Sequence, residues 1–155
     1  MTARSERSYV LDTNLFIRAF RDPAANAELQ RFHQVFAPFE FLSAVVAQEL
    51  RAGARSTPAR RLLERHVLDP FVRRDRVVTP STRVWHESGD LLADMAVDEG
   101  LDVSRVSKAF GNDVLLALSC REAGVVLVTD NDRDFERIRR QVRFAFVGPW
   151  PSPRA

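Results

Sequence analysis

Several acidic side chains stand at positions where a carboxylate is better placed for chemistry than for solubility. Asp12 comes directly after the apolar run 9–11, and Asp113 interrupts the otherwise apolar stretch 111–118. Glu49 lies in a predicted helix about one turn beyond apolar residues, which places it at a pocket edge rather than in open water. These three carboxylates are therefore candidates for a shared site.

Three further carboxylates, Asp130, Asp132 and Asp134, crowd the segment that follows the apolar run 125–128. Four apolar residues in a row predict a strand that is buried on both faces of a sheet. In parallel α/β sheets, ligands bind in the crevice beyond the carboxyl ends of the strands. If this strand pairs with the one that precedes Asp12, the acidic side chains meet at one edge.

Such a cluster is unfavourable unless something neutralises it. Two like charges 4 Å apart repel by about 4 kcal/mol at an effective dielectric constant near 20. Either some carboxylates hold protons or a cation lies among them, and oxygen ligands select hard ions such as Mg²⁺ or Mn²⁺. A hard cation in an acidic cleft suits phosphoryl chemistry, because it activates water and stabilises the leaving oxygen. The sequence has no Cys/His set with zinc spacing, since Cys120 stands alone and His33, His66 and His86 are scattered.

Each acid also has a purely structural interpretation. The aspartates at 130–134 and Asp113 suit helix caps and turns, where Asp is common. Glu49 can pair with a nearby arginine such as Arg51 or Arg55. The spacing alone leaves both interpretations open, and only the conjunction of the acids favours a shared site.

The elements that must position these acids alternate between strands and helices. Apolar runs bounded by turn residues predict strands over 9–11, 40–43, 76–80, 125–128 and 142–147. Helical spacing and caps predict helices over 15–20, 24–36, 44–52, 56–72, 81–99 and 135–140, and over 104–120 in two parts broken near 111–112. This alternation predicts an α/β fold with a central, mainly parallel sheet flanked by helices.

The composition is that of one globular domain. The chain has 155 residues, of which 45% are hydrophobic and 28% charged, and its net charge is only +2. One cysteine cannot form an internal disulfide and fits a reducing compartment. No apolar run approaches the ~20 residues that span a bilayer, and residues 1–8 have no signal-peptide character. We therefore expect a cytoplasmic protein without a membrane partner.

Arginine dominates the basic residues, since Lys108 is the only lysine among 23. Arginine binds phosphate through a planar fork, which favours nucleic acid as a partner, although a GC-rich genome would produce the same bias. Eight arginines fall within 51–76. That segment suits an RNA path, a solvated helix face, or, because the apolar residues within 62–71 exceed what one small helix packs inward, a partner groove.

Four segments together resemble the motifs of PIN-domain nucleases. They are Val10-Leu11-Asp12-Thr13-Asn14, the segment 43–53 around Glu49, the segment 112–118 around Asp113, and the segment 128–135. Each motif alone is weak, but the four occur in order over nearly the whole chain. In size and motif style the chain is most similar to VapC-type toxins of bacterial toxin–antitoxin pairs.

The resemblance implies an acidic core of Asp12, Glu49 and Asp113, with Asp12 and Asp113 as the first choices for direct metal ligands. Many relatives carry an acid where this chain has Asn131, whereas others carry Thr-x-Asn followed by a later acid before Phe. This chain follows the second form, so Asp134 becomes the fourth catalytic and metal-binding candidate, ahead of Asp132 and Asp130. Residues expected to support these ligands are Thr13, Asn14, Thr129, Asn131 and Asp132.

The function implied by the resemblance is that of a Mg²⁺- or Mn²⁺-dependent endoribonuclease. It would hydrolyse RNA with a metal-activated water, be held by a cognate antitoxin, and form a homodimer. The alternative is a catalytically inactive PIN-like module that binds RNA or protein. A haloacid-dehalogenase-type phosphatase fits poorly, because Asn14 stands where it needs a second Asp. The expected organisation is an N-terminal extension over 1–8, a PIN-like nuclease domain over 9–148, and a proline-rich tail over 149–155.

Overall fold

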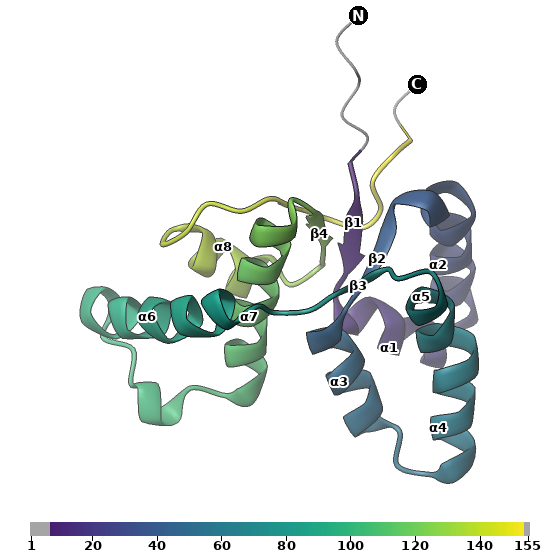
Figure 1. Ribbon diagram of the computed structural model, residues 1–155, viewed down its shortest axis with the longest axis horizontal. Coiled ribbons are helices and arrows are strands. Elements are labelled where there is room, and N and C mark those ends of the chain that lie inside the picture. The colour runs from purple at the N-terminus through teal and green to yellow at the C-terminus, as the bar shows by residue number, and fades with distance from the viewer. Residues whose placement is uncertain (1–6, 154–155) are drawn as a thin grey trace, which may run out of the picture.

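The computed structural model describes residues 7–153, and its centre is a sheet of five parallel strands (Figure 1). The strands are β1 (Tyr9–Leu11), β2 (Glu40–Ser43), β3 (Val77–Val78), β4 (Val126–Val128) and β5 (Phe146–Val147). Their order in the sheet is β3-β2-β1-β4-β5. The predicted α/β fold with a parallel sheet is confirmed, although most of the predicted N-terminal extension (1–6), and residues 154–155 of the tail, lie outside the described residues.

The sheet register places β1 between β2 and β4. Tyr9 pairs with Glu40 on one side and with Val126 on the other, and Leu11 pairs with Val128. All these pairs are parallel, so the carboxyl ends of the three strands lie at the same edge of the sheet. The pairing between the first strand and the strand over 126–128, on which the shared acidic site depends, is therefore present.

Helices surround the sheet on both sides (Figure 1). Those drawn to the right of the strands in Figure 1 are α1 (Thr13–Arg21), α2 (Pro23–Phe36), α4 (Thr57–Leu63) and α5 (Asp69–Arg73), with α3 (Ala44–Gly53) below. To the left lie α6 (Thr82–Glu99), α7 (Lys108–Ala123) and α8 (Asp132–Arg139). Short turns η1 (Ala37–Phe39), η2 (Glu64–Leu68) and η3 (Val103–Arg105) complete the chain.

Two predicted helices differ from the structure. The break expected near 111–112 is wrong: α7 runs without interruption, and Gly111 donates a regular backbone hydrogen bond to Ser107. The cost of an interior glycine, about 1 kcal/mol, is outweighed by the burial of the apolar residues that follow it. The single helix predicted over 56–72 contains the π-helical turn η2, which precedes Pro70, a residue without a backbone N–H donor.

The last predicted strand is shorter than expected. Only β5 pairs with the sheet, whereas Val142 donates its backbone N–H to Ile138 and belongs to the turn after α8. Beyond β5, Trp150 packs against Phe32 and donates its Nε1–H to Glu28 at 3.2 Å. The described part of the proline-rich tail is therefore in contact with the domain.

The hydrophobic core lies between the sheet and its helices. The most deeply buried side chains come from β1, β2, β4, α3, α6, α7 and α8 and include Val10, Leu42, Val46, Met95, Val114, Leu116, Leu127 and Phe135. Burial of one such side chain stabilises the fold by roughly 1.5–3 kcal/mol.

Of the helices in residues 7–153, none combines the length and the apolar character that crossing a bilayer requires.

Candidate acidic active site

Asp12 occupies the junction of the central strand and the first helix. It follows Leu11 of β1 and is the N-cap of α1, where its carboxylate accepts the backbone N–H of Thr13 at 2.8 Å. The hydroxyl of Thr129, which follows β4, donates to its other oxygen at 2.7 Å. Asp12 is only 4% exposed, and the pairing of β1 with β4 brings this buried carboxylate the second of its two partners, Thr129.

Glu49 reaches the same edge from α3. The hydroxyl of Thr13 donates to Glu49 Oε1 at 2.8 Å, and this bond joins the first turn of α1 to the second turn of α3. α3 itself begins where β2 ends, because the side chain of Ser43 caps its first turn. The predicted supporting residue Thr13 therefore links two of the predicted acids.

Asp113 and Asp134 meet at the amide of Asn131. The Nδ2 group of Asn131 donates to Asp113 at 3.4 Å and to Asp134 at 3.2 Å, while its Oδ1 caps the first turn of α8. Its backbone N–H donates to the hydroxyl of Thr129 at 3.0 Å. One asparagine thus connects α7, α8 and the strand β4.

The electrostatics of the site reflect an excess of negative charge. Burial, together with the neighbouring charges of Asp12, Asp134 and Glu49, raises the pKa of Asp113 to about 8. Burial also raises the pKa of Asp12, against the hydrogen bonds from Thr129 and Thr13, and the charge of Glu49 adds to the increase. Near neutral pH the metal-free site therefore holds a proton on Asp113, and a bound cation would replace that proton.

Two predicted supporting residues, Asn14 and Asp132, are not part of this hydrogen-bond network. The side chains of Asn14 and Asp132 are exposed, and within residues 7–153 neither makes a hydrogen bond to the four acids. Asp130 lies at the rim, where Arg18 of α1 forms an ion pair with it. Sequence reasoning did not single out Arg18, because nothing in its own helix indicates a partner 112 residues away.

The chemistry of the donor set fits a hard divalent cation. Its members are carboxylate oxygens, which Mg²⁺ and Mn²⁺ prefer, and their mutual repulsion is what a cation relieves. Within residues 7–153, however, no three Asp, Glu, His or Cys side chains lie close enough together to hold a metal ion in their present conformations. The residues that would hold such an ion are Asp12, Asp113, Asp134 and Glu49.

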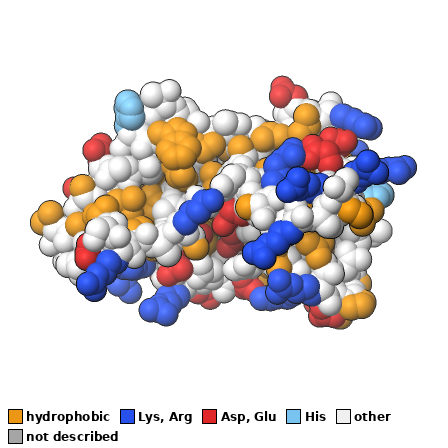
Figure 2. Space-filling model, turned by 90° about the horizontal axis from the view of Figure 1, so that it is seen from below, with side chains coloured by type: hydrophobic (Ala, Val, Ile, Leu, Met, Phe, Trp, Pro, Cys, Tyr) orange, Lys and Arg blue, Asp and Glu red, His pale blue; other side chains and the backbone are white. Residues whose placement is uncertain are grey.

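The acidic site opens on a face that also carries basic side chains. The strands run downward in Figure 1, so their carboxyl ends face the viewer of Figure 2, where acidic side chains near the middle are flanked by arginine and lysine. Exposed arginines of α3, α4 and the turns around them include Arg51, Arg55, Arg60, Arg61 and Arg65. Arginine side chains on a protein surface pair with phosphate groups, so the charge of this face favours a polyanionic partner.

Replacement of Thr129 by Val should destabilise the protein through this site. The side chain is fully buried, and Thr129→Val removes the hydroxyl that donates to Asp12 and accepts from Asn131. We expect the free energy of unfolding to fall by about 1–3 kcal/mol, because buried polar groups lose their partners. Urea unfolding measures the change. Thr129→Ser keeps the hydroxyl and serves as the control, and equal stability of the Val and Ser variants would contradict the prediction.

The fold and the site define a class of protein: a parallel α/β domain with carboxylates gathered beyond the carboxyl ends of its central strands. The PIN domain family model matches residues 9–141. The chain therefore belongs to the PIN domain family. Comparison with curated proteins returns no match.

Several solved structures are similar to the chain. VapBC from Salmonella typhimurium, bound to DNA, is 24% identical with a TM-score of 0.68, over 92% of this chain and 98% of that one. VapBC2 from Rickettsia felis, bound to a DNA fragment from its promoter, is 23% identical with a TM-score of 0.60 over the same shares. FitAcB from Neisseria gonorrhoeae is 19% identical with a TM-score of 0.66, again over 92% and 98%. These likenesses establish the fold.

Proposed function

We propose that the protein is a Mg²⁺- or Mn²⁺-dependent endoribonuclease and the toxin of a toxin–antitoxin pair. PIN domains are generally nucleases, and the chain belongs to that family. The observation that carries the proposal is the convergence of Asp12, Glu49, Asp113 and Asp134 from four different segments on the carboxyl edge of the sheet. The structural relatives, which are toxin–antitoxin complexes, support the toxin assignment.

Each acid has a distinct role in this proposal. Asp12, the most buried, is held by two hydrogen bonds and fixes the position of the centre. Asp113 holds a proton near neutral pH and gives it up when the site is loaded. Glu49 and Asp134 supply the remaining negative charge of the site. Hydrogen bonds from Thr13 and Asn131 orient these two carboxylates. A bound divalent cation supplies the Lewis acidity that activates water and stabilises the leaving oxygen at phosphorus.

The partner proposed here is a protein segment that covers an apolar groove. A cavity of about 600 Å³ lies between α1, α3 and α4, and its lining includes Phe20, Leu62 and Val67. Phe20 and Leu62 are 56% and 60% exposed, which is unusual for large apolar side chains without a partner. The groove supports the predicted antitoxin contact.

We also propose that the protein forms a homodimer, because the family resemblance implies one. Light scattering would test this oligomeric state.

An RNA cleavage assay tests the proposed reaction. A pool of structured and single-stranded RNA is incubated with the purified chain in Mg²⁺, in Mn²⁺ and in EDTA. We expect cleavage with either metal and none with EDTA. Asp12→Asn should lower the rate by on the order of 10²-fold or more, because it removes one charge from the centre while it keeps the shape of the side chain.

The matched control is Asp90→Asn, which makes the same change on an exposed residue of α6 and should cleave at the wild-type rate. Cleavage that persists in EDTA or in Asp12→Asn would contradict the proposal. Absence of cleavage in every condition, with a folded protein that still binds RNA, would favour the alternative of a catalytically inactive RNA-binding module.

A further inference from the structure

Arg18 and Asp130 form an ion pair at the rim of the acidic active site. Arg18 belongs to the last turn of α1, and its Nη2 group donates to Asp130 Oδ2 in the segment between β4 and α8. In the chain Asp130 is flanked by Thr129 and Asn131, two residues that donate side-chain hydrogen bonds to acids of the site. The ion pair therefore connects the end of α1 to the segment that supports the acids.

The Arg18–Asp130 pair lies outside the acids and on the side of Asp12. Burial is the main cause of the raised pKa of Asp12, and the charges of Glu49 and Asp130 add to it. Asp12 is buried, whereas the side chains of Arg18 and Asp130 are 56% and 24% exposed. A substrate strand that reaches the acids from solvent therefore passes this ion pair.

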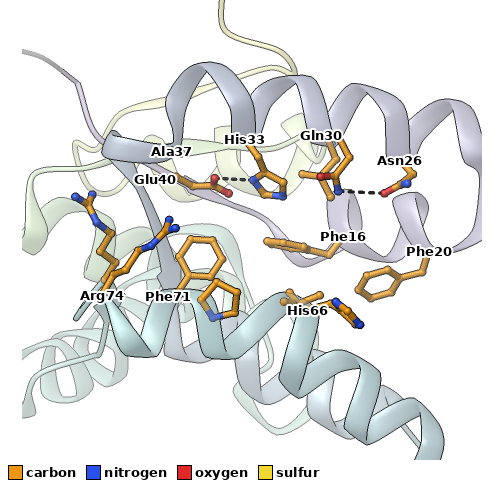
Figure 3. Close-up of a pocket in the computed structure, with 14 residues that line it drawn as sticks. Phe16, Phe20, Asn26, Gln30, His33, Ala37, Glu40, His66, Phe71 and Arg74 are labelled. Atoms are coloured by element: carbon orange, nitrogen blue, oxygen red, sulfur yellow. Dashed lines mark hydrogen bonds and ion pairs between the residues drawn. The ribbon is translucent and has the colours of Figure 1, made fainter.

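Arg18 is not part of the surface proposed for a protein partner. The groove between α1, α3 and α4 shares Phe20, His66 and Val67 with the pocket between α2 and α5 that Figure 3 shows, so the two cavities form one surface. Within residues 7–153, Arg18 lines neither of them. Its guanidinium is therefore accessible to a ligand other than that partner.

The chemistry of the pair allows one anion to replace another. An arginine guanidinium binds a carboxylate and a phosphate through the same planar fork of N–H donors. Ion pairs between partly exposed side chains contribute little to stability, so the exchange costs little. Asn131, rather than Asp130, caps α8, and release of Asp130 therefore leaves the cap of that helix in place.

We propose that Arg18 binds a backbone phosphate of the RNA strand next to the phosphate that is cleaved, and that Asp130 holds this guanidinium in the free protein. That the strand is RNA rests on the proposed function. When the strand binds, its phosphate replaces the carboxylate of Asp130 on the fork. The positive charge of Arg18 then offsets the repulsion between the RNA backbone and the acids. Arg18 is thus a positioning residue, which holds the strand and leaves proton transfer to other groups.

Binding of an RNA that resists cleavage tests this inference. The probe is a short fluorescein-labelled RNA of random sequence, fully 2′-O-methylated, which is titrated with the full chain in EDTA at several concentrations of potassium chloride. We expect Arg18→Gln to raise the dissociation constant about tenfold. The slope of log affinity against log salt should also become shallower by about 0.7, which corresponds to one phosphate contact on a single strand.

Two further variants make this measurement specific. Arg18→Lys keeps the charge without the planar fork, so it should restore the salt slope and only part of the affinity. Arg73→Gln is the matched control: Arg73 is exposed, pairs with Asp69, and lies in α5, which leads into the amino end of β3 at the opposite edge of the sheet. It should bind RNA like the wild type. An equal affinity of Arg18→Gln and Arg73→Gln would overturn the inference.

Asp130→Asn tests the exchange, and its expected effect has the opposite direction. Without the competing carboxylate, binding of the same RNA should become about threefold tighter, a gain that a misfolded variant does not produce. In the Arg18→Gln background the same substitution should have a smaller effect, because no arginine is released. Equal gains in both backgrounds, or weaker binding by Asp130→Asn, would show that Asp130 does not compete for Arg18.

Steady-state cleavage distinguishes positioning from chemistry. Arg18→Gln should raise KM about tenfold and keep kcat within about threefold of the wild type, because the arginine contacts the strand rather than the reacting atoms. A lower kcat with an unchanged KM would contradict this role. The binding measurement in EDTA needs no cleavage. A chain that binds RNA through Arg18 and does not cleave it would therefore contradict the proposed nuclease and support this inference.

Discussion

The variant Asp113→Asn is expected to lose RNA cleavage and to become more stable than the wild type in the absence of metal. Its loss of activity should be on the order of 10²-fold or more, because one of the acids that would hold the cation no longer carries charge. Its gain in stability follows from the removal of a half-buried carboxylate that is repelled by Asp12, Asp134 and Glu49. A structural cap or core residue would show the opposite change in stability.

The pH dependence of stability tests whether repulsion between carboxylates is the reason that Asp113→Asn is more stable than the wild type. The pKa of Asp113 is 3.8 in its ordinary state and about 8 in the folded chain, so the folded state binds the proton more tightly. Wild-type stability therefore falls as pH rises from about 4 to about 8, whereas that contribution is absent from Asp113→Asn.

We expect the difference in unfolding free energy to be negligible near pH 4 and to reach on the order of 1–3 kcal/mol above pH 8, discounted because the side chain is partly exposed. Melting curves in EDTA across this range measure it as a shift of a few degrees. Asp90→Asn controls for the loss of one charge elsewhere. A pH-independent difference, or a destabilised Asp113→Asn, would show that the carboxylates do not repel one another.

The second large effect is expected from metal binding to the wild-type protein. Mg²⁺ or Mn²⁺ should raise the melting temperature, and at a concentration 100 times the dissociation constant the stabilisation amounts to about 2.7 kcal/mol. The cation competes with the proton on Asp113, whose folded pKa is about 8. Apparent affinity should therefore increase with pH, by about tenfold per unit, until pH 8 and then level off.

Two comparisons make the metal prediction specific to the site. In Asp113→Asn the affinity should be lower and should lose this pH dependence, because the competing proton is absent. Potassium chloride at equal ionic strength controls for screening of surface charges. If the thermal shift is the same in Asp113→Asn as in the wild type, the cation binds elsewhere. If neither metal shifts the melting temperature at any pH, the donor set does not form a metal site.

Local signals in the sequence were sufficient to predict most of the helices and strands. The strand before Asp12, the cap at Ser43 and the apolar strand predicted over 125–128 each depend on a few consecutive residues. The structure has the first two as predicted and the third over 126–128. The break predicted at Gly111 failed because propensity is a weak local effect, whereas the burial that overrides it depends on neighbours from elsewhere in the chain.

The sequence by itself determined which residue types end the strands, and hence that acids gather at one edge of a parallel sheet. Only the tertiary structure decided which of these acids lie close enough to change one another's pKa. The amide of Asn131 lies between Asp113 and Asp134, Arg18 pairs with Asp130 rather than with solvent, and Glu40 is buried with one oxygen unpaired. These arrangements depend on contacts between segments far apart in the chain, and sequence periodicity describes only one element at a time. Burial and neighbouring charge, which set the pKa of Asp113, arise when those segments meet.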